Sequence, residues 1–104
     1  MAKIINKEEF ENNVLQSEKI VLVDFFATWC GPCQMLAPIL EDLSKENHDF
    51  EIVKIDIDQE RDLAIENRIE FVPTIVLFKN GKEVDRMTGV FDKNEILEKI
   101  KKYK

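Results

Sequence analysis

The sequence predicts an α/β domain in which a mixed central sheet is covered by helices on both faces. Strand and helix patterns alternate along the whole chain in the order β-α-β-α-β-α-β-β-α, which amounts to five strands and four helices. Strands joined through a helix should run mainly parallel, whereas the last two strands flank Asn80-Gly81, a strong signal for an antiparallel hairpin. With 104 residues, the chain is expected to form a single domain over residues 1–104.

The strands are predicted from short apolar runs. The run over residues 20–27 is apolar on both of its faces, as expected for a central strand that helices cover on both sides. The remaining strands are expected at residues 3–5, 51–57, 74–79 and 82–88.

The helices are predicted from their N-terminal signals. Asn6 with Glu9, and Asp92 with Glu95, have the spacing of a capping box. Asp58 is expected to cap a short helix over residues 59–67. The remaining helix should begin at a cysteine motif, and its apolar face would consist of Cys33, Leu36, Leu40 and Leu43.

Charge and hydropathy exclude several classes of function. The chain has 15 basic and 21 acidic residues and a net charge of −6, which argues against nucleic acid and anionic membranes as partners. The apolar run at residues 20–27 is too short to span a bilayer, and the first residues lack the apolar core of a signal peptide. We therefore expect a cytoplasmic protein without a membrane role.

The segment Trp29-Cys30-Gly31-Pro32-Cys33 contains the only tryptophan and both cysteines of the chain. A disulfide between two cysteines this close closes a very small loop and stabilises a fold little, so a redox-active pair is the better interpretation. Cys30 should lie at a helix N-terminus, where backbone N–H groups and the helix dipole lower the thiol pKa and favour the thiolate. Cys33, one turn into the helix, should be more buried and less nucleophilic.

These positions predict the order of the thiol chemistry. Cys30 would attack a partner's disulfide to form a mixed disulfide, and Cys33 would then resolve it by attacking Cys30. Gly31 would leave access for an incoming peptide. Pro32 suits the first helical turn and stiffens the small ring that the Cys30–Cys33 disulfide closes.

A zinc site is the alternative interpretation of the two cysteines. Tetrahedral zinc needs four ligands, and the chain offers Cys30, Cys33, the distant His48 and a carboxylate. We expect no metal, no role for His48 in catalysis, and no cofactor besides the redox-active disulfide.

Asp24 is predicted to be buried, because it interrupts the apolar run that leads to the cysteines. Burial should raise the pKa of its carboxyl group, which could then accept the proton of Cys33 directly or through a water molecule. The alternative is a buried carboxylate satisfied by polar neighbours, with Lys54 as the candidate. Pro73 opens a predicted strand, and the residues alone favour an ordinary trans proline there.

The chain resembles the thioredoxin family over its whole length. The residues that carry the resemblance are Val23 to Cys33, Ala37-Pro38, Lys54 to Asp58, Val72-Pro73-Thr74, Phe78 to Gly81, and Gly89. The resemblance implies a thioredoxin fold with a mixed five-stranded sheet and four helices.

The resemblance also implies roles for residues outside the cysteine motif. Pro73 would be cis and pack beside the cysteines, and Val72 would pair its backbone with the substrate chain. Trp29 and Gly89 would border the docking surface, and Lys54 would tune the proton affinity of Asp24. Phe71 departs from the family pattern, which often has a small residue there, and could narrow the docking groove.

The expected function is that of a general protein disulfide reductase, a two-electron donor in electron transport and cell redox homeostasis. Its partners would be disulfide-containing client proteins and a separate thioredoxin reductase, an NADPH-dependent flavoprotein, because the chain has no G-x-G-x-x-G nucleotide loop of its own. We expect a monomer. Two alternatives remain open, a disulfide oxidant or isomerase and a non-redox docking subunit of a larger complex.

Overall fold

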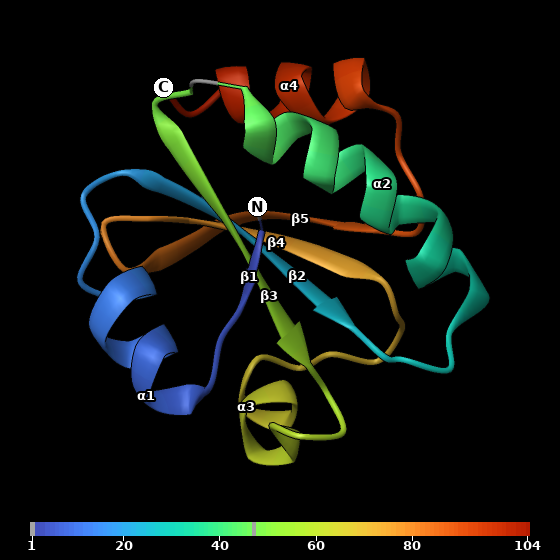
Figure 1. Ribbon diagram of the computed structural model, residues 1–104. Helices are drawn as coiled ribbons and strands as arrows, with labels where there is room; N and C mark the ends of the chain where they lie inside the picture. The colour runs from blue at the N-terminus through green and yellow to red at the C-terminus, as the bar shows by residue number, and fades with distance from the viewer. Residues whose placement is uncertain (1, 47) are drawn as a thin grey trace.

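The computed structural model of this chain describes residues 2–46 and 48–104, so Met1 and Asn47 lie outside the described residues. A five-stranded sheet with the strand order β1-β3-β2-β4-β5 forms its centre (Figure 1). The strands are β1 (Lys3–Ile4), β2 (Ile20–Phe26), β3 (Phe50–Asp56), β4 (Thr74–Lys79) and β5 (Lys82–Thr88). β3 runs parallel to β1 and β2, whereas β4 runs antiparallel to β2 and β5. The predicted mixed sheet is confirmed.

Helices cover both faces of the sheet, as the alternating pattern predicted. α2 (Gly31–Lys45) and α4 (Lys93–Lys101) lie on one face, and α1 (Lys7–Glu9) and α3 (Arg61–Glu66) lie on the other (Figure 1). α1 continues directly into a π-helical segment, η1 (Phe10–Val14). None of the helices in the described ranges is long and apolar enough to cross a membrane.

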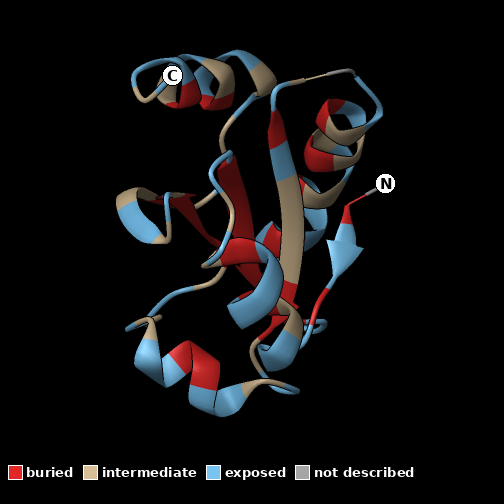
Figure 2. Cartoon of the chain, turned by 90° about the vertical axis from the view of Figure 1, so that its left-hand side faces the viewer, coloured by how far each residue is buried: buried red, intermediate tan, exposed pale blue. Residues whose placement is uncertain are grey.

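Two apolar cores follow from the alternation of side chains along β2. Ile20 and Leu22 pack with α2 and α4, whereas Val21, Val23 and Phe25 pack with η1 and α3. The buried residues accordingly gather on the strands and on the inward sides of the helices (Figure 2). Asp24 has the same parity as Ile20 and Leu22, so its carboxyl group faces the layer of α2, the cysteine helix.

Both predicted capping boxes are present. The Asn6 side chain accepts a hydrogen bond from Glu9 N at 2.9 Å, and the Asp92 side chain accepts one from Glu95 N at 2.8 Å. In each pair the glutamate side chain accepts the N–H of the cap residue in return.

The prediction that Asp58 caps the third helix is wrong. α3 begins at Arg61, and its N-cap residue is Glu60, whose side chain makes no capping hydrogen bond. Asp58 instead accepts a hydrogen bond from the indole Nε1 of Trp29 at 2.8 Å. The carboxylate of Asp58 therefore accepts a hydrogen bond from a side chain distant in the sequence, and not from the helix N-terminus that local spacing predicted.

Several element ends differ from the prediction by a residue. β1 ends at Ile4, β2 ends at Phe26, and β3 spans Phe50–Asp56 in place of residues 51–57. The hairpin between β4 and β5 turns at Asn80 and Gly81, both of which have positive φ, 53° and 78°. A side chain at Gly81 would overlap the backbone carbonyl of Leu15, so this position needs glycine for space as well.

Candidate active site

The two cysteines lie where β2 passes into α2. Cys30 is the N-cap residue of this 15-residue helix, and its Sγ accepts a hydrogen bond from Cys33 N at 3.1 Å. A disulfide joins Cys30 to Cys33, with their Cα atoms 5.2 Å apart. Pro32 occupies the first turn, where a missing N–H leaves no helix hydrogen bond unmade. The structure thus confirms that the pair sits at a helix N-terminus and can close into a disulfide.

The expected difference in burial between the thiols is absent. Cys30 is 5% exposed and Cys33 is 4% exposed, so the two residues are almost equally buried in the disulfide form. Both residues belong to a small apolar cluster with Phe26 and Ala27, which shields them equally in the disulfide form. The asymmetry between the two sulfurs lies in their positions on the helix, because Cys30 accepts the amide hydrogen bond.

A loop from the other side of the sheet completes the site. The Val72–Pro73 peptide bond is cis, as the family resemblance implied and as the residues alone did not. The carbonyl oxygen of Val72 lies 3.6 Å from Cys30 Sγ, so this loop packs directly against the redox-active pair. Gly89 N donates to Pro73 O at 2.9 Å, which ties the end of β5 to the same loop.

Asp24 is fully buried in the sheet. Within residues 2–46 and 48–104, neither of its carboxylate oxygens has a hydrogen-bond partner. Burial raises the pKa of Asp24 to about 7, and the positive charge of Lys54 partly opposes this rise. The predicted elevated pKa therefore has a structural cause.

Lys54 does not satisfy the carboxyl group of Asp24. The two residues are paired neighbours on the parallel strands β2 and β3. The ammonium group of Lys54, however, lies over the ring of Phe26, 4.6 Å from the ring centroid. No polar neighbour among the described residues therefore hydrogen-bonds the carboxyl group of Asp24, and the positive charge of Lys54 lowers the pKa of Asp24.

Apolar side chains are exposed around the cysteine pair. Trp29 is 68% exposed and Phe71 is 66% exposed, and each directly adjoins a residue of the site, Cys30 or Val72. Met35 and Val90 are exposed as well, and sequence reasoning missed both. Their positions in the sequence could have indicated their place near the site, because Met35 follows Cys33 by two residues and Val90 follows Gly89.

The zinc interpretation finds no support in the arrangement of the three candidate ligands. Cys30 and Cys33 begin α2, whereas His48 follows its far end and stacks on the ring of Phe50 at a centroid distance of 4.5 Å. Among the described residues there is no cluster of three or more histidine, cysteine or acidic side chains that could hold a metal ion.

Comparisons with known proteins agree with this geometry. The family model described as Thioredoxin matches residues 1–102. The chain belongs to the thioredoxin family. The thioredoxin of Mycoplasmoides gallisepticum is 41% identical to it over 101 residues, which are 97% of this chain and 100% of that one. The thioredoxin of Chlamydia trachomatis is 41% identical over 103 residues, 99% of each chain.

Solved structures lead to the same conclusion. The X-ray structure of Fasciola hepatica thioredoxin superposes with a TM-score of 0.88 at 36% identity and covers 100% of both chains. The thioredoxin Mala s 13 of Malassezia sympodialis also gives a TM-score of 0.88, at 33% identity, and the match covers 98% of this chain and 90% of that one. The predicted thioredoxin fold is confirmed.

Family membership and the Cys30–Cys33 pair together define the activity. The chain is a thiol–disulfide oxidoreductase with protein-disulfide reductase activity, and its electrons pass through the redox-active disulfide. The family implies two kinds of partner, client proteins that contain disulfides and a reductase that regenerates the dithiol. Neither a non-redox docking role nor a disulfide oxidant is favoured.

Proposed function

We propose that this protein is a general two-electron donor to client disulfides, with Cys30 as the nucleophile and Cys33 as the resolving thiol. One observation carries the assignment: Cys30 Sγ caps α2 and accepts the N–H of Cys33 at 3.1 Å. Amide donors and the positive end of a helix dipole stabilise a thiolate there. Gly31 contributes by leaving access for an incoming peptide, and Pro32 contributes by stiffening the first turn of the helix between the two cysteines.

In the first step, the Cys30 thiolate attacks one sulfur of the client disulfide. A new S–S bond forms between Cys30 and the client, the client's own S–S bond breaks, and the displaced client sulfur leaves as a thiolate that takes up a proton. The thiol of Cys33 remains protonated throughout this step.

In the second step, Cys33 loses its proton and attacks Cys30 Sγ. The Cys30–Cys33 disulfide forms, the mixed disulfide breaks, and the second client sulfur leaves and is protonated, so that two electrons have passed to the client. Asp24 accepts the proton of Cys33, directly or through a water molecule. Its buried carboxyl group faces the α2 layer and has a pKa of about 7, which suits proton exchange at neutral pH. Lys54 tunes this proton affinity through its charge.

The client chain docks on the Val72–Pro73 loop, alongside Trp29 and Gly89. The position of Val72 O, 3.6 Å from Cys30 Sγ, supports backbone pairing between Val72 and the residues that flank a client cysteine. Gly31 and Gly89 leave the surface open, because a Cβ at either position would meet no atom within 4 Å. The exposed ring of Phe71 narrows this surface and favours clients with apolar residues next to the cysteine.

The protein works in the cytoplasm, in electron transport and redox homeostasis, and is recycled by an NADPH-dependent flavoprotein. A reducing compartment supports a donor role, because disulfides there are kept transient. A net charge of −6 favours a monomer, and a single sheet that pairs strands from both ends of the chain favours one domain over residues 1–104. Size-exclusion chromatography tests the monomer, and NADPH consumption with a purified flavoprotein reductase tests the recycling.

The reduction of insulin disulfides, with dithiothreitol as the electron source, tests the central proposal. We expect rapid precipitation of insulin chains with the wild-type protein and the uncatalysed rate with Cys30→Ser. Equal rates for wild type, Cys30→Ser and a blank without protein would refute the assignment of Cys30.

A further inference from the structure

The turn that follows α3 adopts a strained conformation. Helix α3 ends in two hydrogen bonds of the Schellman type, from Ile69 N to Ala64 O and from Arg68 N to Ile65 O, both 3.0 Å long. This motif needs a left-handed residue, and here that residue is Arg68, with a φ of 56°. Glycine is the usual choice at such a position, because a side chain crowds the backbone there. The turn is therefore expected to need support from outside.

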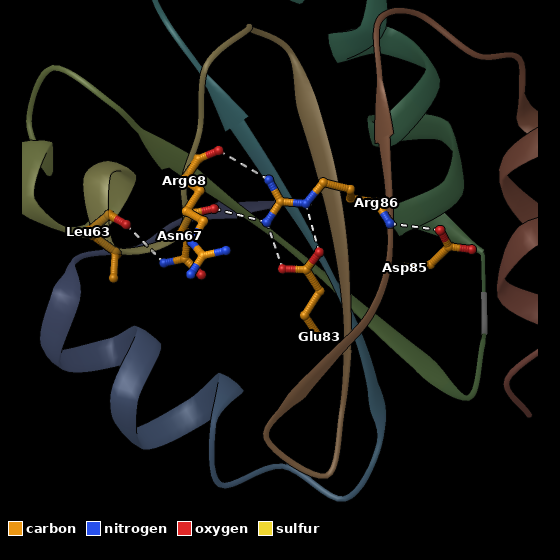
Figure 3. A network of polar contacts seen from close by, with 6 residues as sticks. All are labelled: Leu63, Asn67, Arg68, Glu83, Asp85 and Arg86. Atoms are coloured by element: carbon orange, nitrogen blue, oxygen red, sulfur yellow. Dashed lines mark hydrogen bonds and ion pairs between the residues drawn. The ribbon is translucent and has the colours of Figure 1, made fainter.

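Arg86 of β5 supplies that support. Its guanidinium group donates to Asn67 O at 2.9 Å and to Arg68 O at 3.3 Å (Figure 3). The last carbonyl groups of a helix have no partner within the helix, so a distant arginine here completes the C-terminal end of α3. The guanidinium group suits this purpose because it offers about five N–H donors in one rigid plane.

Glu83 holds the guanidinium group in place. Its two carboxylate oxygens accept from Arg86 Nε at 2.7 Å and from Arg86 Nη2 at 2.6 Å, as Figure 3 shows. This ion pair, with a smaller contribution from Glu70, raises the pKa of Arg86 above its usual value. The arginine stays charged and oriented at every pH at which the protein works.

The supported turn leads directly into the client-docking loop. Five residues, from Ile69 to Pro73, connect it to the cis peptide beside Cys30. The far end of this segment is held by Gly89 N, which donates to Pro73 O at 2.9 Å. Arg86 and Gly89 are three residues apart at the end of β5, so one short stretch of chain holds both ends of the loop.

We propose that Arg86 is a positioning residue for client docking, because it fixes the Asn67–Arg68 turn from which the Val72–Pro73 loop begins. This proposal rests on the proposed docking role of that loop. Arg86 is not among the residues that would contact the client, and it acts through the turn. Losing it should therefore weaken the binding of protein substrates and leave the reactivity of Cys30 unchanged.

Steady-state kinetics with two substrates test this inference. For Arg86→Met we expect KM for insulin to rise about three- to tenfold, the effect of one or two lost hydrogen bonds. The rate with a small aromatic disulfide, which needs no docking surface, should remain that of wild type. Arg86→Lys should behave like Arg86→Met, because one ammonium group cannot reproduce the planar fork. Lys82→Met is the matched control, since it removes the same charge from an exposed position of β5.

A second substitution separates support of the turn from general stability. Arg68→Gly removes the strain that makes the support necessary, so the double variant Arg86→Met/Arg68→Gly should recover a KM close to that of wild type. A double variant as impaired as Arg86→Met, or a single variant with unchanged KM, overturns the proposal. If Arg86→Met does not fold, Glu83→Gln replaces it as the test, because it loosens the guanidinium group without removing it. Glu83→Gln should also raise KM for insulin, and an unchanged KM for this variant would overturn the proposal.

Pro73→Ala distinguishes the failure of this inference from the failure of the docking proposal. If Pro73→Ala leaves KM for insulin unchanged, the loop does not dock clients, and both proposals fall. If Pro73→Ala raises KM and Arg86→Met does not, the loop docks clients but Arg86 does not position it.

Discussion

Helices α1 and α4 begin with conventional polar caps, whereas α2 begins with a cysteine. In the first two, Asn6 or Asp92 accepts the N–H of a glutamate three residues on, and that glutamate accepts the N–H of the cap in return. In α2 the same two positions are occupied by Cys30 and Cys33. This spacing forms a capping box in α1 and α4. In α2 it places two sulfurs within bonding distance.

This difference shows how one local geometry serves either stability or chemistry. An asparagine or aspartate cap has no redox chemistry and contributes only to stability. A cysteine cap changes its state, because it can be a thiolate, a mixed disulfide or part of the Cys30–Cys33 disulfide. The amide donors that stabilise a helix end in α1 and α4 therefore also stabilise the reactive form of the nucleophile in α2.

The largest expected effect comes from replacing each of the two cysteines of the α2 N-terminus with serine in turn. Cys33→Ser should form a mixed disulfide with a client through Cys30 and be unable to release it, because no resolving thiol remains. Cys30→Ser should form almost none. Non-reducing gels with mass spectrometry of the adduct measure both, and an adduct that accumulates through Cys33 would contradict the assigned order.

Replacing Asp24 should have the next largest effect on chemistry. For Asp24→Asn we expect release of a preformed mixed disulfide at pH 7 to slow by about 100-fold, the lower end of the usual effect of a general base. The two proteins should converge at alkaline pH, where Cys33 ionises without help. Rapid-mixing kinetics across pH measure this, and equal rates at neutral pH would leave Asp24 without a proton-transfer role.

The same substitution should change how stability depends on pH. Burial raises the pKa of Asp24 from an ordinary value of 3.8 to about 7, so the folded protein binds this proton more tightly than the unfolded chain. Stability should then fall as pH rises from about 4 to about 7, by up to about 4 kcal/mol, and level off above. Asp24→Asn should lack this component and be the more stable protein at pH 8.

Urea unfolding at several pH values measures the effect of Asp24 on stability. Subtracting the Asp24→Asn curve from that of wild type removes the contribution of carboxyl groups common to both, such as Glu9 and Asp85, whose lowered pKa values act in the opposite direction. A difference that does not vary with pH would be inconsistent with a buried carboxyl group of raised pKa.

The smallest effect is expected at a conventional cap. Asn6→Ala removes the capping box of α1 and should lower the free energy of unfolding by about 1 kcal/mol. The insulin reductase rate should stay that of wild type, because α1 lies on the face of the sheet opposite α2 (Figure 1). Thermal unfolding and the insulin assay on the same sample measure both quantities. A lower insulin reductase rate for Asn6→Ala would contradict the distinction between a cap that only stabilises its helix and a cap that reacts.

Local patterns predicted the features that depend on neighbours in the sequence. The two capping boxes, the hairpin at Asn80-Gly81 and the buried Asp24 all rest on residues a few positions apart, where helix and strand geometry dictates the outcome. The cis form of Pro73 needed the family resemblance, because the residues alone favour trans.

Long-range contacts could not be predicted in this way. The spacing of Asp58 predicts a helix cap, but its hydrogen-bond partner is Trp29, 29 residues away. The clamp of Arg86 on Asn67 spans 19 residues and requires β5 to lie beside the end of α3. The equal burial of Cys30 and Cys33 likewise depends on the cluster with Phe26 and Ala27, which no periodicity within α2 reveals.

The most direct test of the comparison between caps is the alkylation rate of each thiol in the reduced protein as a function of pH. Iodoacetamide, with peptide mass spectrometry to assign the modified residue, reports the thiolate form of each cysteine separately. We expect Cys30 to be modified first at pH 7, and its modification rate to rise at a pH clearly below the value of about 8.5 at which an ordinary cysteine ionises. Equal rates for both thiols, or faster modification of Cys33, would contradict the claim that the cap of α2 activates Cys30.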